Sequence, residues 1–299
     1  MKDAFELALI NGKLPSPKRL CYLHRVDEET VPISQNDLDA SIQWFDKIPD
    51  KRVFRRGEVL HRQTGPWATA VHSLLEHLEN VGFPAAPRII GTGFDSDGLE
   101  TLTFIEGEFV QPGPWTIDGA AAVGQLLKRL HDATASHRPA PDALWRPWFG
   151  RDLGGHSRII GHCDAGPWNI VSRNGLPVAL IDWDFAGPVD PLVDLAQACW
   201  LNAKLHSDDV AAREGLPPLR DRACQLRAMV EGYGLAKDLR RGFVRLMIDF
   251  AIYSVAAEAD EFGIAPDTKK TDGLWGMAWR ARSAAWMLRN EQTLQNALS

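Results

Sequence analysis

Apolar side chains recur along the chain at two spacings, which predict a strand-rich first part and a helix-rich second part. In the first part, Trp67, Val71, Leu74 and Leu78 follow one another at spacings of three and four residues, so they share one face of a helix. Another helix is expected over residues 37–45. Strands are expected here over residues 52–62, 87–90 and 99–105. The first of these segments folds into a hairpin that turns at Gly57.

After Gly107 the helical spacing dominates, and only short strands interrupt it. The expected helices cover residues 121–133, 191–205, 219–232, 239–258 and 273–290, and the short strands cover 158–161, 169–172 and 177–181. Strands at the front and helices at the back predict an α+β protein of two lobes. The boundary is expected between a small lobe of residues 1–106 and a larger helical lobe of residues 107–299.

Composition and charge narrow the classes of function. Of 299 residues, 45% are hydrophobic and 24% are charged, as in ordinary globular proteins. The net charge of −6 argues against a protein that coats nucleic acid, and it suits a cationic small molecule as partner. A polyhydroxylated small molecule is the other expected kind of partner. No apolar run approaches the roughly 18 residues of a membrane span. Four widely spaced cysteines fit a reduced, cytoplasmic protein, and the oligomeric state is open.

The polar residues with the most informative spacing lie between positions 161 and 184, in GHCDAGPWNIVSRNGLPVALIDWD. Asp164 follows His162 by two residues, Asn169 follows Asp164 by five, and Asp182 comes directly after an apolar strand. Kinases place an Asp and an Asn at this spacing in their catalytic loop, followed by a magnesium-binding Asp. Oxygens of Asn169 and Asp182 can hold a divalent cation, while Asp164 can accept the proton of a hydroxyl group. His162 is expected to organise the loop.

Two alternatives to this chemistry stay open. The same Asp and Asn residues are common in turns that precede a strand, where they need have no catalytic role. A kinase-like binding module that transfers nothing is the other alternative, because the first lobe lacks part of the usual phosphate-binding pattern.

The segments GHCDAGPWNIV and VALIDWDFAGPVDPLVDLAQACW resemble the aminoglycoside phosphotransferase-like enzymes and their relatives that act on choline, homoserine and other small alcohols. The resemblance extends to GPWATAVHSLLEHLENVGFPAAPRIIG and to Leu127-Lys128-Arg129-Leu130-His131, and covers about residues 50 to 290. It implies a protein-kinase-like fold, ATP or GTP as phosphate donor, and Mg²⁺ as cofactor.

The resemblance also assigns roles to individual residues. Asp164 corresponds to the catalytic base, and Asn169 and Asp182 correspond to the metal ligands. Asp194 corresponds to an acidic residue that, with His162, braces the catalytic loop; an ordinary Asp of a first helical turn is the alternative. The segment around the hinge, Thr103, Phe104, Ile105 and Glu106, corresponds to the backbone that holds the nucleobase.

The first lobe departs from the family pattern. No G-x-G-x-x-G precedes the hairpin, and Arg62 stands where a phosphate-clamping Lys is expected. An Arg at a solvated strand end is the alternative. The Glu expected on the following helix is missing, since Val71 or His72 falls there and Glu76 comes about one turn late.

Acidic residues near the catalytic loop and in the second lobe could bind a cationic acceptor: Asp184, Glu258 and Glu261. A solvated helix end is the alternative for Glu258 and Glu261. The expected activity is therefore phosphoryl transfer from a nucleoside triphosphate to a hydroxyl of a small molecule. An aminoglycoside is the first choice of acceptor, and choline, homoserine, sugars and nucleosides stay open.

Overall fold

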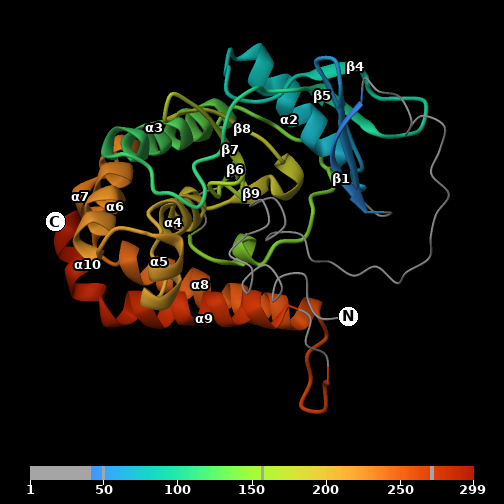
Figure 1. Cartoon of the computed structure of the whole chain (residues 1–299). Coiled ribbons are helices and arrows are strands. Elements are labelled where there is room, and N and C mark those ends of the chain that lie inside the picture. Colours follow the sequence, from blue (N-terminus) through green and yellow to red (C-terminus); the bar gives the residue numbers. More distant parts are fainter. Residues whose placement is uncertain (1–41, 49–50, 156–157, 270–272) are drawn as a thin grey trace.

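A computed structural model describes residues 42–48, 51–155, 158–269 and 273–299. Figure 1 shows a sheet with one helix beside it at one end of the molecule, followed by a body built mainly of helices. The sheet has five strands in the order β1-β2-β3-β5-β4, and every neighbouring pair is antiparallel. Its strands are β1 Ile42–Ile48, β2 Lys51–Arg56, β3 Val59–Arg62, β4 Ile89–Phe94 and β5 Glu100–Thr103.

The hairpin between β2 and β3 turns at Gly57, as the sequence predicts. Gly57 has a φ of +60°, a left-handed conformation that glycine adopts without steric cost. Helix α2, Ala68–Asn80, packs against β4 through its predicted apolar face, on which Val71, Leu74 and Leu78 are buried. The predicted alternation of strand, helix and strand is therefore present in this part of the chain.

The helix predicted over residues 37–45 is wrong from Ile42 onward. Residues 42–45 belong to β1, whose Trp44 lies opposite Phe54 of β2 with ring centroids 4.9 Å apart. In so short a segment the apolar spacing fits either structure, and the cross-strand contacts decide in favour of the strand. Residues 37–41 lie outside the described part of the chain.

The helical part contains the predicted helices together with elements that the pattern did not indicate. Its helices are α3 Ile117–Thr134, α4 Pro191–Asn202, α5 Asp208–Glu214, α6 Leu219–Tyr233, α7 Lys237–Arg240, α8 Phe243–Glu261, α9 Leu274–Arg289 and α10 Glu291–Leu298. Helices α5 and α10 were not predicted. The helix expected over 239–258 is interrupted before α8 by Gly242, which has a φ of +80°.

Short strands and turns between α3 and α4 carry the polar residues of the 161–184 segment. They are η3 Phe149–Asp152, β6 Ile159–Gly161, β7 Ile170–Arg173, β8 Leu176–Leu180, η4 Trp183–Phe185 and β9 Gly187–Val189. Strand β7 pairs with β8, and β6 pairs with β9, both antiparallel. The fold is thus α+β, with a strand-rich sheet first and a helical region after it, as predicted; the boundary at residues 106 and 107 stays a prediction.

The hydrophobic core extends from α2 through α3 to the later helices. Helix α4 is buried along nearly its whole length, from Val193 to Asn202, because it lies between other elements instead of on the surface. Across the described residues, no helix has both the length and the apolar character that a membrane crossing requires.

One buried charge in this core predicts a dependence of stability on pH. Lys204 follows α4 and is 1% exposed, and burial lowers the pKa of its ammonium to about 8. The folded state therefore binds fewer protons than the unfolded state between pH 8 and 10.5, so this residue adds stability as pH rises through that range.

The Lys204→Met variant is expected to lose that contribution. The free energy of unfolding of the parent, relative to the variant, should be flat from pH 7 to 8 and then rise toward pH 10.5, by on the order of 3 kcal/mol. Urea unfolding at each pH measures both proteins. If the unfolding free energies of the two proteins differ by the same amount at every pH up to 10.5, burial does not lower the pKa of Lys204.

Candidate active site

The loop between β6 and β7 joins Asp164 and Asn169 directly. The Asn169 side-chain N–H group donates to the carboxylate of Asp164 at 2.8 Å and to its backbone carbonyl at 2.9 Å. The backbone N–H of Asn169 donates to the carbonyl of Gly166 at 2.9 Å, which closes the turn. Because the amide nitrogen of Asn169 is directed at Asp164, the amide oxygen is the atom of this side chain that suits a cation.

The second carboxylate of the site, Asp182, follows strand β8. The backbone N–H of Ile181 donates to the carbonyl of Asn169 at 2.9 Å, so β8 delivers Asp182 next to the catalytic loop. Asp182 has a φ of 61°, a left-handed conformation that costs a residue with a side chain about 1–3 kcal/mol. Asp is one of the few residue types that tolerate it.

The charge of Asp182 acts on Asp164. Burial raises the pKa of Asp164 to about 8, and the negative charge of Asp182 adds to that rise. The Asn169 N–H group and the positive charge of Arg280 oppose it. A buried carboxylate whose proton affinity is raised by a second carboxylate marks a place where added positive charge is favourable.

Arg62 on β3 brings positive charge to this place. Its two terminal nitrogens lie 2.8 Å from Asp182 Oδ1 and 2.7 Å from Asp184 Oδ1, and its Nε donates to Glu100. Burial alone would lower the pKa of Arg62, but the three carboxylates hold it well above the ordinary value. The side chain is 8% exposed, which excludes the alternative of a solvated strand end.

Glu100 on β5 was missed by the sequence analysis. It lies directly opposite Arg62 in the β3–β5 pair and has no exposed surface. His72 of α2 contacts its second oxygen at 2.9 Å. The helix therefore contributes a histidine where a glutamate was expected, and the carboxylate comes from the neighbouring strand. The cross-strand register, which the sequence alone does not give, is the signal that would have found it.

Asp194 in the first turn of α4 holds the backbone of the catalytic loop. Its carboxylate accepts from the backbone N–H groups of Cys163 at 2.8 Å and His162 at 3.1 Å, and contacts His131 at 3.0 Å. Burial alone would raise the pKa of Asp194, but the hydrogen bond and charge of His131 hold it below the usual value. His131 in turn contacts the Tyr233 hydroxyl at 2.8 Å; neither residue was predicted for the site.

His162 connects the loop to the strand that carries Asp182. Its ring nitrogen Nε2 lies 3.1 Å from the carbonyl oxygen of Ile181, and its ring packs edge-on against Trp183 with centroids 4.7 Å apart. Burial lowers the pKa of His162, which favours the neutral ring. This position suits a residue that organises the loop.

The contacts of Asp194 predict a loss of stability in the Asp194→Asn variant. The amide would place an N–H group against backbone N–H donors in a fully buried position, so unfolding free energy should fall by about 2–4 kcal/mol. Urea unfolding measures this loss of unfolding free energy. The matched control is Asp132→Asn on the exposed face of α3, whose pairing with Lys128 should be worth less than about 1 kcal/mol. Equal losses in the two variants would contradict a special role of Asp194.

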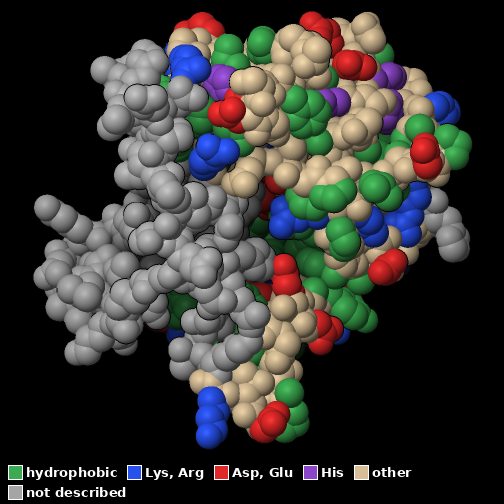
Figure 2. Space-filling model, turned by 90° about the vertical axis from the view of Figure 1, so that its right-hand side faces the viewer, with side chains coloured by type: hydrophobic (Ala, Val, Ile, Leu, Met, Phe, Trp, Pro, Cys, Tyr) green, Lys and Arg blue, Asp and Glu red, His purple; other side chains and the backbone are tan. Residues whose placement is uncertain are grey.

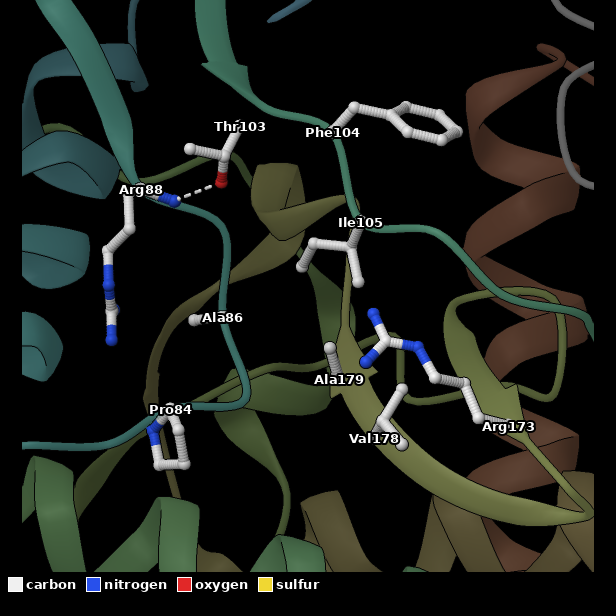
Figure 3. Close-up of a pocket in the computed structure, with 9 residues that line it drawn as sticks. All are labelled: Pro84, Ala86, Arg88, Thr103, Phe104, Ile105, Arg173, Val178 and Ala179. Atoms are coloured by element: carbon white, nitrogen blue, oxygen red, sulfur yellow. Dashed lines mark hydrogen bonds between the residues drawn. The ribbon is translucent and has the colours of Figure 1, made fainter. Parts of the chain in front are cut away.

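Three of the four expected hinge residues line a cavity of about 290 Å³. Thr103, Phe104 and Ile105 lie on one side of it, and Val178 and Ala179 of β8 lie on the other (Figure 3). The Thr103 hydroxyl accepts from the Arg88 backbone N–H at 2.8 Å, as Figure 3 shows. Glu106 does not line the cavity.

The side chain of Glu106 instead forms an ion pair with Arg55 of β2. Its backbone carbonyl accepts from Arg173 at 3.0 Å, and the Arg173 side chain lines the cavity. Thr103, Phe104 and Ile105 therefore line one side of this cavity, with Arg173 beside them.

The segment that carries these residues matches a known protein family. Residues 140–225, which contain Asp164, Asn169, Asp182 and Asp194, match the model of the phosphotransferase enzyme family. The trifolitoxin immunity protein of Rhizobium leguminosarum bv. trifolii is 54% identical over 247 residues, which cover 83% of this chain and 95% of that protein. The chain belongs to the phosphotransferase enzyme family. The protein is a small-molecule phosphotransferase.

Solved structures of several kinases share the fold of this phosphotransferase. An amicoumacin kinase in complex with AMP-PNP, Ca²⁺ and Ami has a TM-score of 0.58 at 11% identity, over 86% of this chain and 88% of that one. A microcompartment-associated aminopropanol kinase has a TM-score of 0.55 at 12% identity, over 87% and 94%. An ADP-bound aminoglycoside phosphotransferase has a TM-score of 0.50 at 14% identity, over 82% and 93%. The similarity shows a kinase-like fold.

The donor atoms of this phosphotransferase fit a magnesium ion. Mg²⁺ is usually held by one or two carboxylates together with substrate phosphates, and Asn169 and Asp182 offer an amide oxygen and a carboxylate. Asp182 also contacts the guanidinium of Arg62 at 2.8 Å, so a metal ion would share this carboxylate with Arg62. Among the described residues, no group of three or more His, Cys, Asp or Glu side chains forms a metal site from protein atoms alone. A magnesium ion held by Asn169 and Asp182 would therefore take its remaining ligands from the nucleotide.

The expected acceptor residues of the phosphotransferase lie in two different surroundings. Asp184 is buried beside Arg62 and has Arg146 3.6 Å away, so its charge is already balanced by arginines. Glu258 of α8 pairs with Arg280 of α9 at 2.5 Å, and Glu261 is exposed at the end of α8. Acidic and basic side chains meet at a hollow in the middle of the face shown in Figure 2. Asp184 and Glu258 therefore each have an arginine as ion-pair partner.

Proposed function

We propose that the protein transfers the terminal phosphoryl group of ATP or GTP to a hydroxyl group of a small molecule. The observation that carries this proposal is the joining of Asp164 to Asn169, with Asp182 delivered beside them by β8. An acidic oxygen for the hydroxyl proton and two oxygen donors for a cation are the parts that phosphoryl transfer needs.

Asp164 would orient the acceptor hydroxyl and take its proton as the oxygen attacks phosphorus. Asn169 would fix the rotamer of Asp164 through its N–H group, and Asn169 and Asp182 would hold the Mg²⁺. The bound ion would neutralise negative charge on the phosphoryl group in transfer. Asp194 and His162 would keep the loop in place during this step.

The donor nucleotide would lie between the hinge cavity and Arg62. Ile105, Val178 and Ala179 offer apolar contact for the face of a nucleobase. Arg62 presents two terminal nitrogens, which suit phosphate oxygens better than a single ammonium does. ATP and GTP remain alternatives, because the cavity walls do not select between the two bases.

We further propose that the acceptor is an antibiotic. The name of the 54% identical relative refers to immunity against trifolitoxin, and phosphorylation of a hydroxyl is one way to inactivate an antibiotic. An aminoglycoside suits the acidic balance of the chain and Glu261 at the end of α8. The pairing of Glu258 with Arg280 reduces the negative charge available for a strongly cationic acceptor, which favours testing trifolitoxin in parallel.

The test is a screen for nucleotide consumption with Mg²⁺ and ATP or GTP over aminoglycosides, trifolitoxin, choline, homoserine and aminopropanol, with the Asp164→Asn variant as blank. Mass spectrometry should find one added phosphoryl group on the acceptor only with the parent protein. A binding module that sequesters a toxin is the second candidate. It would be stabilised by the toxin in a thermal-shift assay without consuming nucleotide.

A further inference from the structure

Glu100 accepts a hydrogen bond from the guanidinium of Arg62, and no role has so far been assigned to Glu100. Arg62 and Glu100 are register partners on the adjacent antiparallel strands β3 and β5, so their side chains point to the same face of the sheet. The Nε of Arg62 donates to Oε2 of Glu100, which has no exposed surface. A buried carboxylate in such a position persists only when it is paired.

Because the guanidinium is planar and rigid, its three nitrogens move as one unit, and a contact to one of them restricts the positions of the other two. With Nε directed at Glu100, the terminal nitrogens Nη1 and Nη2 face Asp182 and Asp184 at 2.8 and 2.7 Å. The outer edge of Arg62 thus points toward the place where Asp182 would meet the metal and the donor phosphates.

The other oxygen of Glu100 links this arrangement to α2. His72 Nε2 lies 2.9 Å from Oε1, so the carboxylate contacts a strand residue with one oxygen and a helix residue with the other. His72 is 9% exposed, and its ring also packs on Phe94 with centroids 5.1 Å apart. The helix and the sheet therefore both determine the orientation of Glu100.

We propose that Glu100, held by His72, is a positioning residue that aims Arg62 at the donor triphosphate. This inference rests on the proposed function, since it names the residue that prepares the donor side of the same site. It explains how the first lobe works without a glutamate at the expected position of α2: strand β5 supplies the carboxylate, and Arg62 replaces the expected lysine. Arg62 contacts Glu100, Asp182 and Asp184 with three separate nitrogens, whereas a lysine would have to contact all three carboxylates with one nitrogen.

The test measures the Kd for Mg²⁺-AMP-PNP by calorimetry, a readout that needs no acceptor. The Glu100→Gln variant keeps the shape of the side chain and removes its charge, and it should bind at least tenfold more weakly. The matched control is Glu76→Gln on the exposed face of α2, which should bind like the parent. An unchanged Kd in Glu100→Gln would overturn the inference.

A double variant separates positioning from a general loss of structure. If Glu100 acts through Arg62, adding Glu100→Gln to Arg62→Gln should weaken binding less than twofold further. Additive effects would overturn the inference. Should Glu100→Gln fail to fold, His72→Phe and His72→Gln replace it: the phenylalanine should weaken binding, and the glutamine, which can still donate to Glu100, should restore it. Equal binding by these two variants would also overturn the inference.

The proposed function can fail separately. If the parent consumes no nucleotide with any acceptor while Glu100→Gln still weakens Mg²⁺-AMP-PNP binding, then Glu100 positions Arg62 in a nucleotide-binding protein without transfer activity. If the parent transfers phosphate and Glu100→Gln binds nucleotide normally, only the role of Glu100 is wrong.

Discussion

The Asp164→Asn variant is expected to lose phosphoryl transfer by about two to four orders of magnitude while still binding Mg²⁺-nucleotide. The amide has nearly the shape of the carboxylate but cannot accept the proton of the acceptor hydroxyl. It can still accept the hydrogen bond from Asn169, which measures 2.8 Å in the parent, so the loop should keep its conformation. Steady-state turnover with the best acceptor of the screen measures the loss.

The control for this variant is Asp132→Asn, the same change on the exposed face of α3, which should leave turnover unchanged. Nucleotide affinity should also be similar in the parent and in Asp164→Asn. Turnover equal to that of the parent would show that Asp164 is not the base. Loss of nucleotide binding together with turnover would instead place Asp164 among the ligands of the donor.

The Asp182→Asn variant is expected to lose the part of nucleotide binding that depends on Mg²⁺. Asparagine is the appropriate substitution, because it tolerates the left-handed conformation that Asp182 adopts at a φ of 61°. If Asp182 is a ligand of the metal, removing its charge should weaken Mg²⁺-AMP-PNP binding by at least tenfold, or about 1.4 kcal/mol.

A thermal-shift titration makes this difference visible. A ligand at a hundred times its Kd stabilises a protein by about 2.7 kcal/mol, so the parent should melt at a higher temperature with AMP-PNP and Mg²⁺ than with AMP-PNP and EDTA. In Asp182→Asn the two curves should lie closer together than in the parent, whereas Asp164→Asn should behave like the parent. A full Mg²⁺-dependent shift in Asp182→Asn would exclude it as the metal ligand.

Features encoded over short distances could be predicted from the sequence. The face of α2 follows from the spacing of Val71, Leu74 and Leu78, since a helix brings residues three and four apart together. The turn at Gly57 follows from the conformational freedom of glycine between two alternating runs. The spacing of Asp164 and Asn169 is likewise local, because one turn of the catalytic loop joins them.

Features that depend on pairing between distant segments could not be predicted in this way. Glu100 meets Arg62 only because β3 and β5 are neighbours in register, although 38 residues separate them in the sequence. Residues 42–45 have an ambiguous apolar spacing, and the contact of Trp44 with Phe54 decides their conformation. In each case the deciding contact arises from tertiary structure.

The residues that hold the catalytic loop illustrate the same limit. Asp194 could be proposed from a family resemblance, but its contact with His131, and that of His131 with Tyr233, join three helices that are remote in the sequence. An aspartate in a first helical turn is common for electrostatic reasons alone. Only its hydrogen bonds to the backbone of His162 and Cys163 distinguish it from such a residue.

The most direct measurement is a Mn²⁺ titration of the protein with AMP-PNP, followed by electron paramagnetic resonance, in the parent and three variants. Convergence of Asn169 and Asp182 on one cation beside Asp164 predicts a tight Mn²⁺ site in the parent and in Asp164→Asn. The site should be weakened in both Asn169→Ala and Asp182→Asn. Tight Mn²⁺ binding that persists in both of those variants would contradict the assignment of the metal site, and with it the proposed phosphoryl transfer.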